Sequence, residues 1–273
     1  MTRQSLTRTG PGRAVTVLAA TVLAVAVLAG AGVAGLAASA AFATTSSPVA
    51  PPTPGGATSS TRLAKIRAAG EAAINQRVTA LNQVVTVLNG TSWLGPDQAT
   101  LVATAQSDIA GLTKLGSRLA ADTTVQQAKT DYQQIFAGFR VFALVIPVDQ
   151  MVRASNGITN VVVPKFNALE TKWAALDDPQ IAGLLSDMQG KTQAADAAVN
   201  GLPATLEALT PSSWNSNHGI LSQPRSELAT ARQDLKQARD DAQQIVQILR
   251  SQHPHGASGV NPGTSSTTSS VAS

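Results

Sequence analysis

Residues 221–249 read LSQPRSELATARQDLKQARDDAQQIVQIL, and this stretch decides the fold class. Its main apolar positions recur every seven residues, and four more accompany them. They are Leu221, Leu228, Leu235, Ala242 and Leu249, with Ala231, Ala238, Ile245 and Ile248 beside them. This pattern, over about four heptads, predicts a helix with a coiled-coil-like seam. Because several seam residues are small alanines, we expect the helix to pack inside a bundle rather than to form a free-standing dimer.

The rest of the central chain shows the same periodicity. Apolar residues at three- and four-residue spacing predict further helices. Their ranges are 62–88, 97–121, 124–146, 148–176 and 181–199, the last continuing in phase to 209. No strand pattern competes with them. Since the connections are short, sequential helices should run antiparallel, and we expect an all-α fold: an elongated antiparallel bundle of about five or six long helices.

Glycine, proline and short polar residues suggest where these helices begin and end. Asn89-Gly90 predicts a left-handed cap at the end of the first helix. Asp122 or Thr123 is expected to cap the start of the helix at 124–146. Pro147 should end that helix, because the apolar pattern changes phase there. We expect a kink at Pro164 and a kink or short break at Asn200-Gly201.

The first 43 residues have the three parts of a secretory signal. A basic lead precedes an uncharged run at 14–43, which ends in two A-x-A sequences; the basic residues are Arg3, Arg8 and Arg13. We expect export of the chain with cleavage after Ala43. The alternative is that the apolar run, residues 14–38, stays uncut as a membrane anchor, since about 20 apolar residues suffice to span a bilayer.

The remaining chain divides into three parts by composition. Residues 44–60 are rich in Ser, Thr and Pro and predict a flexible linker, residues 61–252 hold the helical bundle, and residues 253–273 predict a disordered tail. The chain contains no cysteine, so a disulfide and a lipid-modified cysteine are both impossible. The bundle must therefore be stable through its core alone.

The charge of the exported part argues against nucleic acid as a partner. Three of the 20 Lys and Arg residues lie in the basic lead, which leaves 17 against 16 acidic residues. A nearly neutral chain offers no field that would follow a phosphate backbone.

No residue pattern predicts catalysis, a cofactor or a metal site. His218 lies in a polar turn, and His253 and His255 lie in the tail, where two imidazoles are too few for a specific metal site. The acidic pairs Asp177-Asp178 and Asp240-Asp241 suggest a helix cap and a solvated face, because neighbours on a helix point apart. Neither G-x-S-x-G nor Glu-x-x-His occurs. We therefore do not expect an enzyme.

Arg140 interrupts the most apolar stretch of the exported part, residues 136–146. This stretch is too short to span a bilayer, and a helix buried on several sides explains it better. A buried Arg140 would need a carboxylate, and three acids are candidates by type: Asp108, Asp131 and Asp149. The favoured interpretation is that Arg140 extends to the surface along its aliphatic stem.

The chain has three tryptophans, Trp93, Trp173 and Trp214. They could line a ligand cleft. Tryptophans in such positions more often close the ends of a bundle, which is the interpretation we favour.

Four segments carry a resemblance to a known group. They are Leu94-Gly95-Pro96-Asp97, the apolar turn from Asp131-Tyr132 through Phe139-Arg140-Val141-Phe142 to Ile146-Pro147, Leu209-Thr210-Pro211, and Leu228 to Lys236. In these segments the chain resembles a group of actinobacterial secreted helical proteins, over about residues 62 to 252. That group has no assigned activity, so the resemblance implies export and a helical fold but no functional residue.

These observations favour a secreted or envelope-associated module that acts by binding or scaffolding, through the face of the last helix. Its partner would be an unknown envelope or extracellular protein. The alternative function is an extracytoplasmic carrier of a small apolar ligand or lipid, held around residues 136–146 and the tryptophans. The membrane would be contacted only through the N-terminal segment, if that segment stays uncut.

Overall fold

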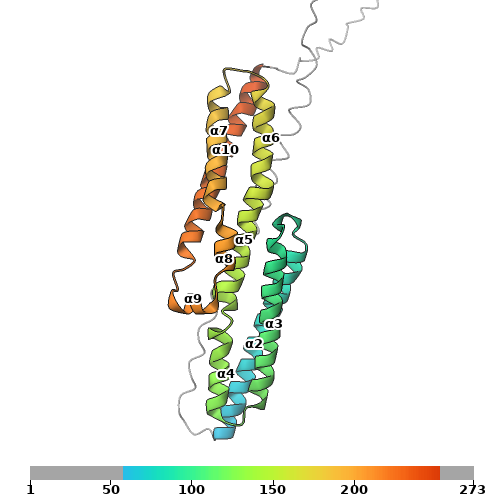
Figure 1. Cartoon of the computed structure of the whole chain (residues 1–273), viewed down its shortest axis with the longest axis vertical. Coiled ribbons are helices and arrows are strands. Elements are labelled where there is room, and N and C mark those ends of the chain that lie inside the picture. Colours follow the sequence, from blue (N-terminus) through green and yellow to red (C-terminus); the bar gives the residue numbers. More distant parts are fainter. Residues whose placement is uncertain (1–57, 253–273) are drawn as a thin grey trace, which may run out of the picture.

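The computed structural model describes residues 58–252, and this part of the chain is all-α, as expected, without a strand. Figure 1 shows an elongated molecule in which the helices run along the long axis. The predicted signal segment, most of the linker and the tail lie outside the described residues. Ser59 and Ser60, assigned to the linker from composition, are the first residues of helix α2.

Three helices form the N-terminal part. They are α2 (Ser59–Asn89), α3 (Asp97–Ala121) and α4 (Val125–Ala137), with the short 3-10 helix η2 (Ser92–Leu94) between the first two. Helix α2 packs against both α3 and α4. Their shared core contains Ile74, Leu81, Leu112, Leu115, Leu119 and Ile135.

A long helical run follows α4 after a break at residues 138–140. It consists of η3 (Val141–Val145), α5 (Ile146–Gly157), η4 (Ile158–Val162) and α6 (Val163–Ala174), and both η3 and η4 are π-helical turns. At 1.5 Å per residue, the run from residue 141 to 174 is roughly 50 Å long.

The expected end of a helix at Pro147 is wrong. The chain stays helical through Pro147, and the break lies earlier, at Gly138–Arg140. A π-turn places an extra residue in the helix, so η3 shifts the phase of the apolar pattern at the point where the sequence suggested a helix end. Pro147 and Pro164 each follow a π-turn, where the ladder is already rearranged and the missing N–H is tolerated.

The C-terminal part contains four helices: α7 (Ala182–Val199), α8 (Leu202–Glu207), α9 (Pro211–Ser216) and α10 (Ser222–Gln252). Helix α10 packs along α7, and α7 packs against α6. The heptad seam of α10 is thus used inside a bundle. The core of this part contains Phe166, Leu169, Trp173, Met188, Ala238 and Ile245.

Helices α2, α3 and α4 form one three-helix bundle, and α6, α7 and α10 form a second. The two bundles lie end to end, and the long helical run leads from the first into the second, where it ends as α6 (Figure 1). A third core cluster joins them. It contains Leu88 and Leu94 from the end of the α2–α3 hairpin, Val148 and Met151 from α5, and Leu206 from α8. Helix α2 begins at one end of the molecule and α10 finishes at the opposite end (Figure 1).

Two of the predicted caps are wrong. Gly90 follows α2 with φ −86° and ψ 0°, which is right-handed. Helix α4 is capped by Thr124, not by Asp122 or Thr123, because Gln127 stands three residues later and completes a capping box with Thr124. The predicted break at Asn200-Gly201 is confirmed, with Gly201 at φ 80°.

Candidate interaction surface and the junction between the bundles

The described residues, 58–252, contain no group of three or more His, Asp or Glu side chains that could hold a metal ion. Candidate functional features are therefore found on the surface and at irregular points of the backbone. Three stand out: the end of the α2–α3 hairpin, the break before η3, and a hollow between α7, α8 and α10.

The three tryptophans lie in different parts of the structure. Trp173 is 1% exposed and belongs to the core around α6, α7 and α10. Trp214 lies half-buried on α9, with its ring centroid 5.7 Å from that of His218. Trp93, in η2, is 43% exposed. Only Trp93 therefore offers a large apolar surface to a partner.

Trp93 is held at the end of the hairpin by contacts with the long helical run. Its Nε1 lies 3.6 Å from the point where a Cβ on Gly157 would be. Asn160 Nδ2 donates a hydrogen bond of 2.9 Å to the carbonyl oxygen of Trp93. Asn156 Nδ2 donates one of 2.7 Å to Asp97 Oδ2. These contacts fix η2 and the start of α3 against α5 and η4.

The chain around Trp93 carries no charge. From Val78 to Pro96 the sequence contains no Asp, Glu, Lys, Arg or His. We call residues 78–96 the charge-free segment. It includes both of the large apolar side chains that are exposed among the described residues, Trp93 and the 47% exposed Val87.

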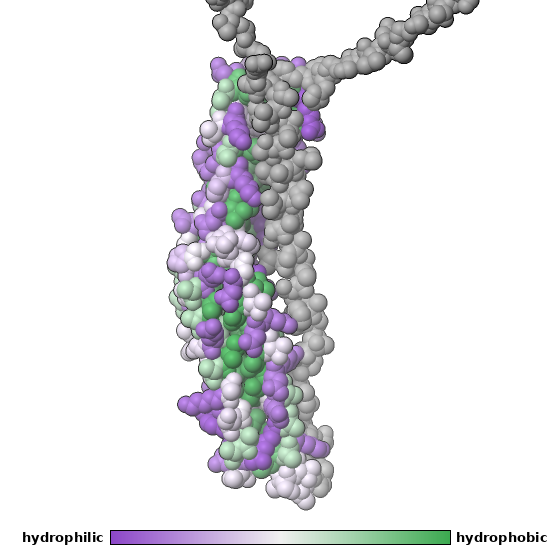
Figure 2. All heavy atoms as spheres, turned by 90° about the vertical axis from the view of Figure 1, so that its right-hand side faces the viewer, coloured by the Kyte–Doolittle hydropathy of each residue, from purple (hydrophilic) through white to green (hydrophobic). Residues whose placement is uncertain are grey.

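A shallow groove runs along the outer side of α2 within this segment, and it is lined by Thr79, Asn82, Gln83, Thr86 and Val87. Figure 2 shows the side of the molecule on which α3 lies in Figure 1, where apolar residues form a stripe between polar ones. The charge-free segment thus presents hydroxyl, amide and apolar groups, and the carboxylate of Asp97 follows directly after it at the start of α3.

The break before η3 centres on Arg140, which has φ 47° and ψ 33°, a left-handed conformation. A residue with a Cβ pays roughly 1–2 kcal/mol for this conformation. Arg140 Nε donates a hydrogen bond of 2.6 Å to Asn215 Oδ1 on α9. Asn215 Nδ2 in turn donates one of 3.0 Å to the carbonyl oxygen of Ala137. We call these three residues the Asn215 clasp.

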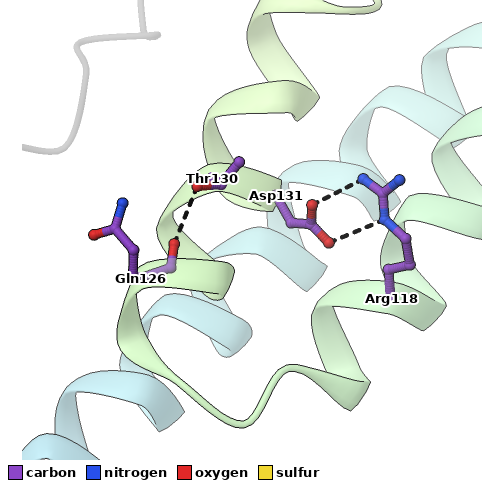
Figure 3. A network of polar contacts seen from close by, with 4 residues as sticks. All are labelled: Arg118, Gln126, Thr130 and Asp131. Atoms are coloured by element: carbon purple, nitrogen blue, oxygen red, sulfur yellow. Dashed lines mark hydrogen bonds and ion pairs between the residues drawn. The ribbon is translucent and has the colours of Figure 1, made fainter.

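Neither sequence interpretation of Arg140 anticipated this partner. The candidate carboxylates are engaged elsewhere or lack an ion pair with Arg140. Asp131 binds Arg118 through two hydrogen bonds of 2.8 and 3.1 Å, which join α3 to α4 (Figure 3). Asp149 pairs with Arg153 at 3.0 Å, and burial raises the pKa of Asp149 while Arg153 offsets part of the increase. Burial raises the pKa of Asp108 to about 6.

The aromatic residues of the stretch 136–146 contact the other helices of the N-terminal bundle. Arg77 is 6% exposed, and its guanidinium carbon lies 4.4 Å from the ring centroid of Phe136 and 5.3 Å from that of Phe142. Its Nη1 donates a hydrogen bond of 2.8 Å to the carbonyl oxygen of Ala73. Phe139 lies against Gly111 on α3. The helical stretch 125–174 is long and apolar enough to cross a membrane by length and composition. It is broken at residues 138–140, however, and these aromatic side chains pack within the bundle.

Sequence reasoning overlooked Arg77 and Asn215. Arg77 carried a signal, since it stands three residues after Ile74 and four before Leu81, on the apolar stripe of its helix. Asn215 gave none, because it lies in a polar turn and its partners are 75 and 78 residues away.

The third feature is a hollow of ≈ 610 Å³ between α7, α8 and α10. Apolar side chains make up about half of its wall, and Gln223 and Glu227 stand at its α10 side. The apolar members are Ala197, Ala198, Leu202, Leu209, Ile220 and Pro224.

Comparison with protein-family models, with curated proteins and with solved structures finds no match to this chain. The class of the protein is therefore defined by its fold and surface. It is an elongated all-helical protein of two end-to-end bundles, with the charge-free segment at their junction.

Proposed function

We propose that the protein is an extracytoplasmic binding or scaffolding module, and that the charge-free segment is where its protein partner binds. The observation that carries the proposal is the coincidence of two features. Both exposed large apolar side chains, Val87 and Trp93, fall in the segment without charge. Single exposed apolar residues are common on soluble proteins, whereas an exposed tryptophan in a stretch depleted of charge has the composition of an interface core.

Physical chemistry favours this surface over the outer face of α10. Tryptophan contributes strongly to protein interfaces because it buries a large rigid area, and uncharged neighbours avoid the cost of desolvating ions. The apolar seam of α10 is already covered by α7, and residues such as Arg225 and Lys236 stand on its outer side. We therefore move the proposed binding surface from the last helix to the hairpin end.

The shape of the molecule supports a scaffolding role. Helix α2 begins at one end of the molecule and α10 finishes at the opposite end, so the described part of the chain spans the full long axis (Figure 1). With export through residues 1–43, the protein would hold an envelope or extracellular partner at the junction, between those two ends.

Site-specific photo-crosslinking in intact cells tests the proposal. A photoreactive residue at Val87 should form a discrete crosslinked species, and the same residue at Gln233, exposed on α10, is the matched control. Excess purified protein should compete for the crosslink, and Trp93→Ala should remove it. Equal crosslinking from both positions, or an unchanged crosslink after Trp93→Ala, would refute the assignment of the surface.

Export needs its own measurement. The mass of the protein recovered from the cell surface or medium should correspond to a chain that begins at Thr44. A chain that begins at Met1 and remains with the membrane would replace cleavage by anchoring through residues 14–38, and a cytoplasmic chain would remove the extracytoplasmic part of the proposal.

One observation favours the carrier as a second candidate. The hollow between α7, α8 and α10, at ≈ 610 Å³, falls in the size range of small-molecule sites, about 300–1,000 Å³, and about half of its lining is apolar. Native mass spectrometry after mild purification should then detect a bound apolar molecule that Thr205→Trp displaces. Protein that is always empty would exclude this candidate.

A further inference from the structure

We infer that the Asn215 clasp is a releasable latch that holds the junction between the two bundles in a strained closed form. The inference stands on the geometry at Arg140 and does not depend on the proposed function. Strained backbone persists only where its surroundings hold it, so the first question is what holds Arg140 left-handed.

The answer is a closed ring of contacts. Helix α4 packs on α2, the end of the α2–α3 hairpin packs on α5, and the chain must pass from α4 to α5 through residues 138–140. An unbroken helix from α4 into α5 would carry the N-terminal bundle in a different direction, away from this docking. Val141, directly after the break, is buried in the core of the N-terminal bundle, while Val148 and Met151 of α5 contact the hairpin end. The left-handed residue therefore follows from holding both η3 and α5 against this bundle, and undocking of the bundle from the long helical run would remove the need for it.

Asn215 offsets this strain from across the break. Ala137 is the last residue of α4, where helix carbonyls lose their intrahelical partners, and Asn215 supplies a donor to it. Its amide oxygen simultaneously accepts from Arg140. One exposed side chain thus bonds both sides of the break.

Helix α9 is built so that it can leave. None of its residues is fully buried, and a capping box between Thr210 and Ser213 starts it. Trp214 is its one apolar side chain that packs, half-buried, against the third core cluster. Elements with few buried contacts open at the lowest free energy. When α9 moves away, the Ala137 carbonyl and the Arg140 guanidinium form hydrogen bonds with water instead, while the left-handed backbone of Arg140 stays unfavourable. Right-handed conformation at residue 140, with φ near −63°, then relieves the strain and favours the undocked hairpin.

The undocked form would break the bonds from Asn156 to Asp97 and from Asn160 to the Trp93 carbonyl. The core residues Leu88 and Leu94 oppose undocking, so the open form should be a minor state in the native protein. Loss of the two clasp hydrogen bonds should raise the open-to-closed ratio about ten- to a hundredfold.

Distance measurement by double electron–electron resonance tests the latch on the full chain. The protein contains no cysteine, so labels at Thr86→Cys on α2 and Gln233→Cys on α10 stand alone. The native chain should give one distance population. Asn215→Ala should add a second, longer one, while Ser212→Ala, an exposed change on the same helix, should leave the distribution as in the native chain.

Replacing Arg140 distinguishes strain from simple bonding. Glycine adopts the left-handed conformation without penalty, so Asn215→Ala combined with Arg140→Gly should return the distances to the single native population. A longer population that persists in this double variant would overturn the strain argument. Asn215→Ala with only the native population would overturn the latch, and because Asn215 is exposed, its replacement leaves both cores intact.

Discussion

Gly70 and Gly190 offer a matched test of how closely α2 approaches its neighbours. Both lie inside long helices, where alanine is favoured over glycine by roughly 0.5–1 kcal/mol. A Cβ on Gly70 would clash with Leu119 Cδ2, with Tyr132 and Ile135 at 3.4 and 3.5 Å. A Cβ on Gly190 would meet nothing within 4 Å.

The two alanine variants should therefore change stability in opposite directions. Gly190→Ala gains the propensity term alone, about 0.5–1 kcal/mol. Gly70→Ala gains the same term and loses about 1–3 kcal/mol to overpacking, because Leu119 is 2% exposed and has little room to move. The variants should differ by about 1–3 kcal/mol, or roughly 2–12 °C in Tm for a domain of this size.

Urea unfolding followed by circular dichroism measures both variants. A double-mutant cycle with Leu119→Ala sharpens the test: the added methyl at residue 70 should cost at least about 1 kcal/mol less once the Leu119 side chain is shortened. If Gly70→Ala stabilises the protein as much as Gly190→Ala, the close approach of α2 to α3 at this point is refuted.

Three further predictions concern single side chains. Arg77→Met should leave the free energy of unfolding within about 1 kcal/mol or raise it, because burial lowers the pKa of Arg77 and no carboxylate pairs with it among the described residues; a loss above about 3 kcal/mol in urea unfolding would contradict this. The pKa of Asp108 is raised to about 6 from 3.8, so the folded state binds the proton more tightly than the unfolded state. The stability lost by burying the ionised carboxylate is therefore absent below about pH 4 and complete above about pH 7. Asp108→Asn should therefore raise Tm near pH 7.5 and leave it unchanged near pH 3.5, and an equal rise at both values would exclude burial as the cause. Thr124→Ala should cost about 1 kcal/mol by removing the cap of α4, whereas Thr123→Ala, next to it, should cost much less in the same unfolding assay.

The sequence predicted most helices because apolar periodicity reports the buried face directly. Helix α10 is the clearest case, since its heptad positions Leu228, Ala238 and Ile245 are buried. The break at residues 138–140 was not predicted, because arginine disfavours the left-handed conformation and only tertiary contacts impose it on Arg140. The π-turn η3 has no composition of its own, so its phase shift was assigned to the nearby Pro147.

The surface features divide in the same way. The absence of charge between Val78 and Pro96 can be read from the sequence, but the exposure of Trp93 depends on where η2 lies on Gly157. The clasp could not be predicted, because Asn215 and Arg140 meet only after both bundles have formed.

Several backbone irregularities lie close to the junction between the bundles, although Asp177, with φ 48°, is left-handed outside it. The break, the left-handed Arg140 and both π-turns fall between residues 138 and 162, whereas α2 and α10 are uninterrupted over 31 residues each. The break and η3 bring Val141 into the core of the N-terminal bundle, where it is buried. A few residues later the same run supplies Val148 and Met151 to the third cluster, where they meet Leu88 and Leu94 of the hairpin end. The strain at Arg140 is therefore the consequence of holding η3 and α5 against the N-terminal bundle, and separation of that bundle from the long helical run should change the conformation of the break.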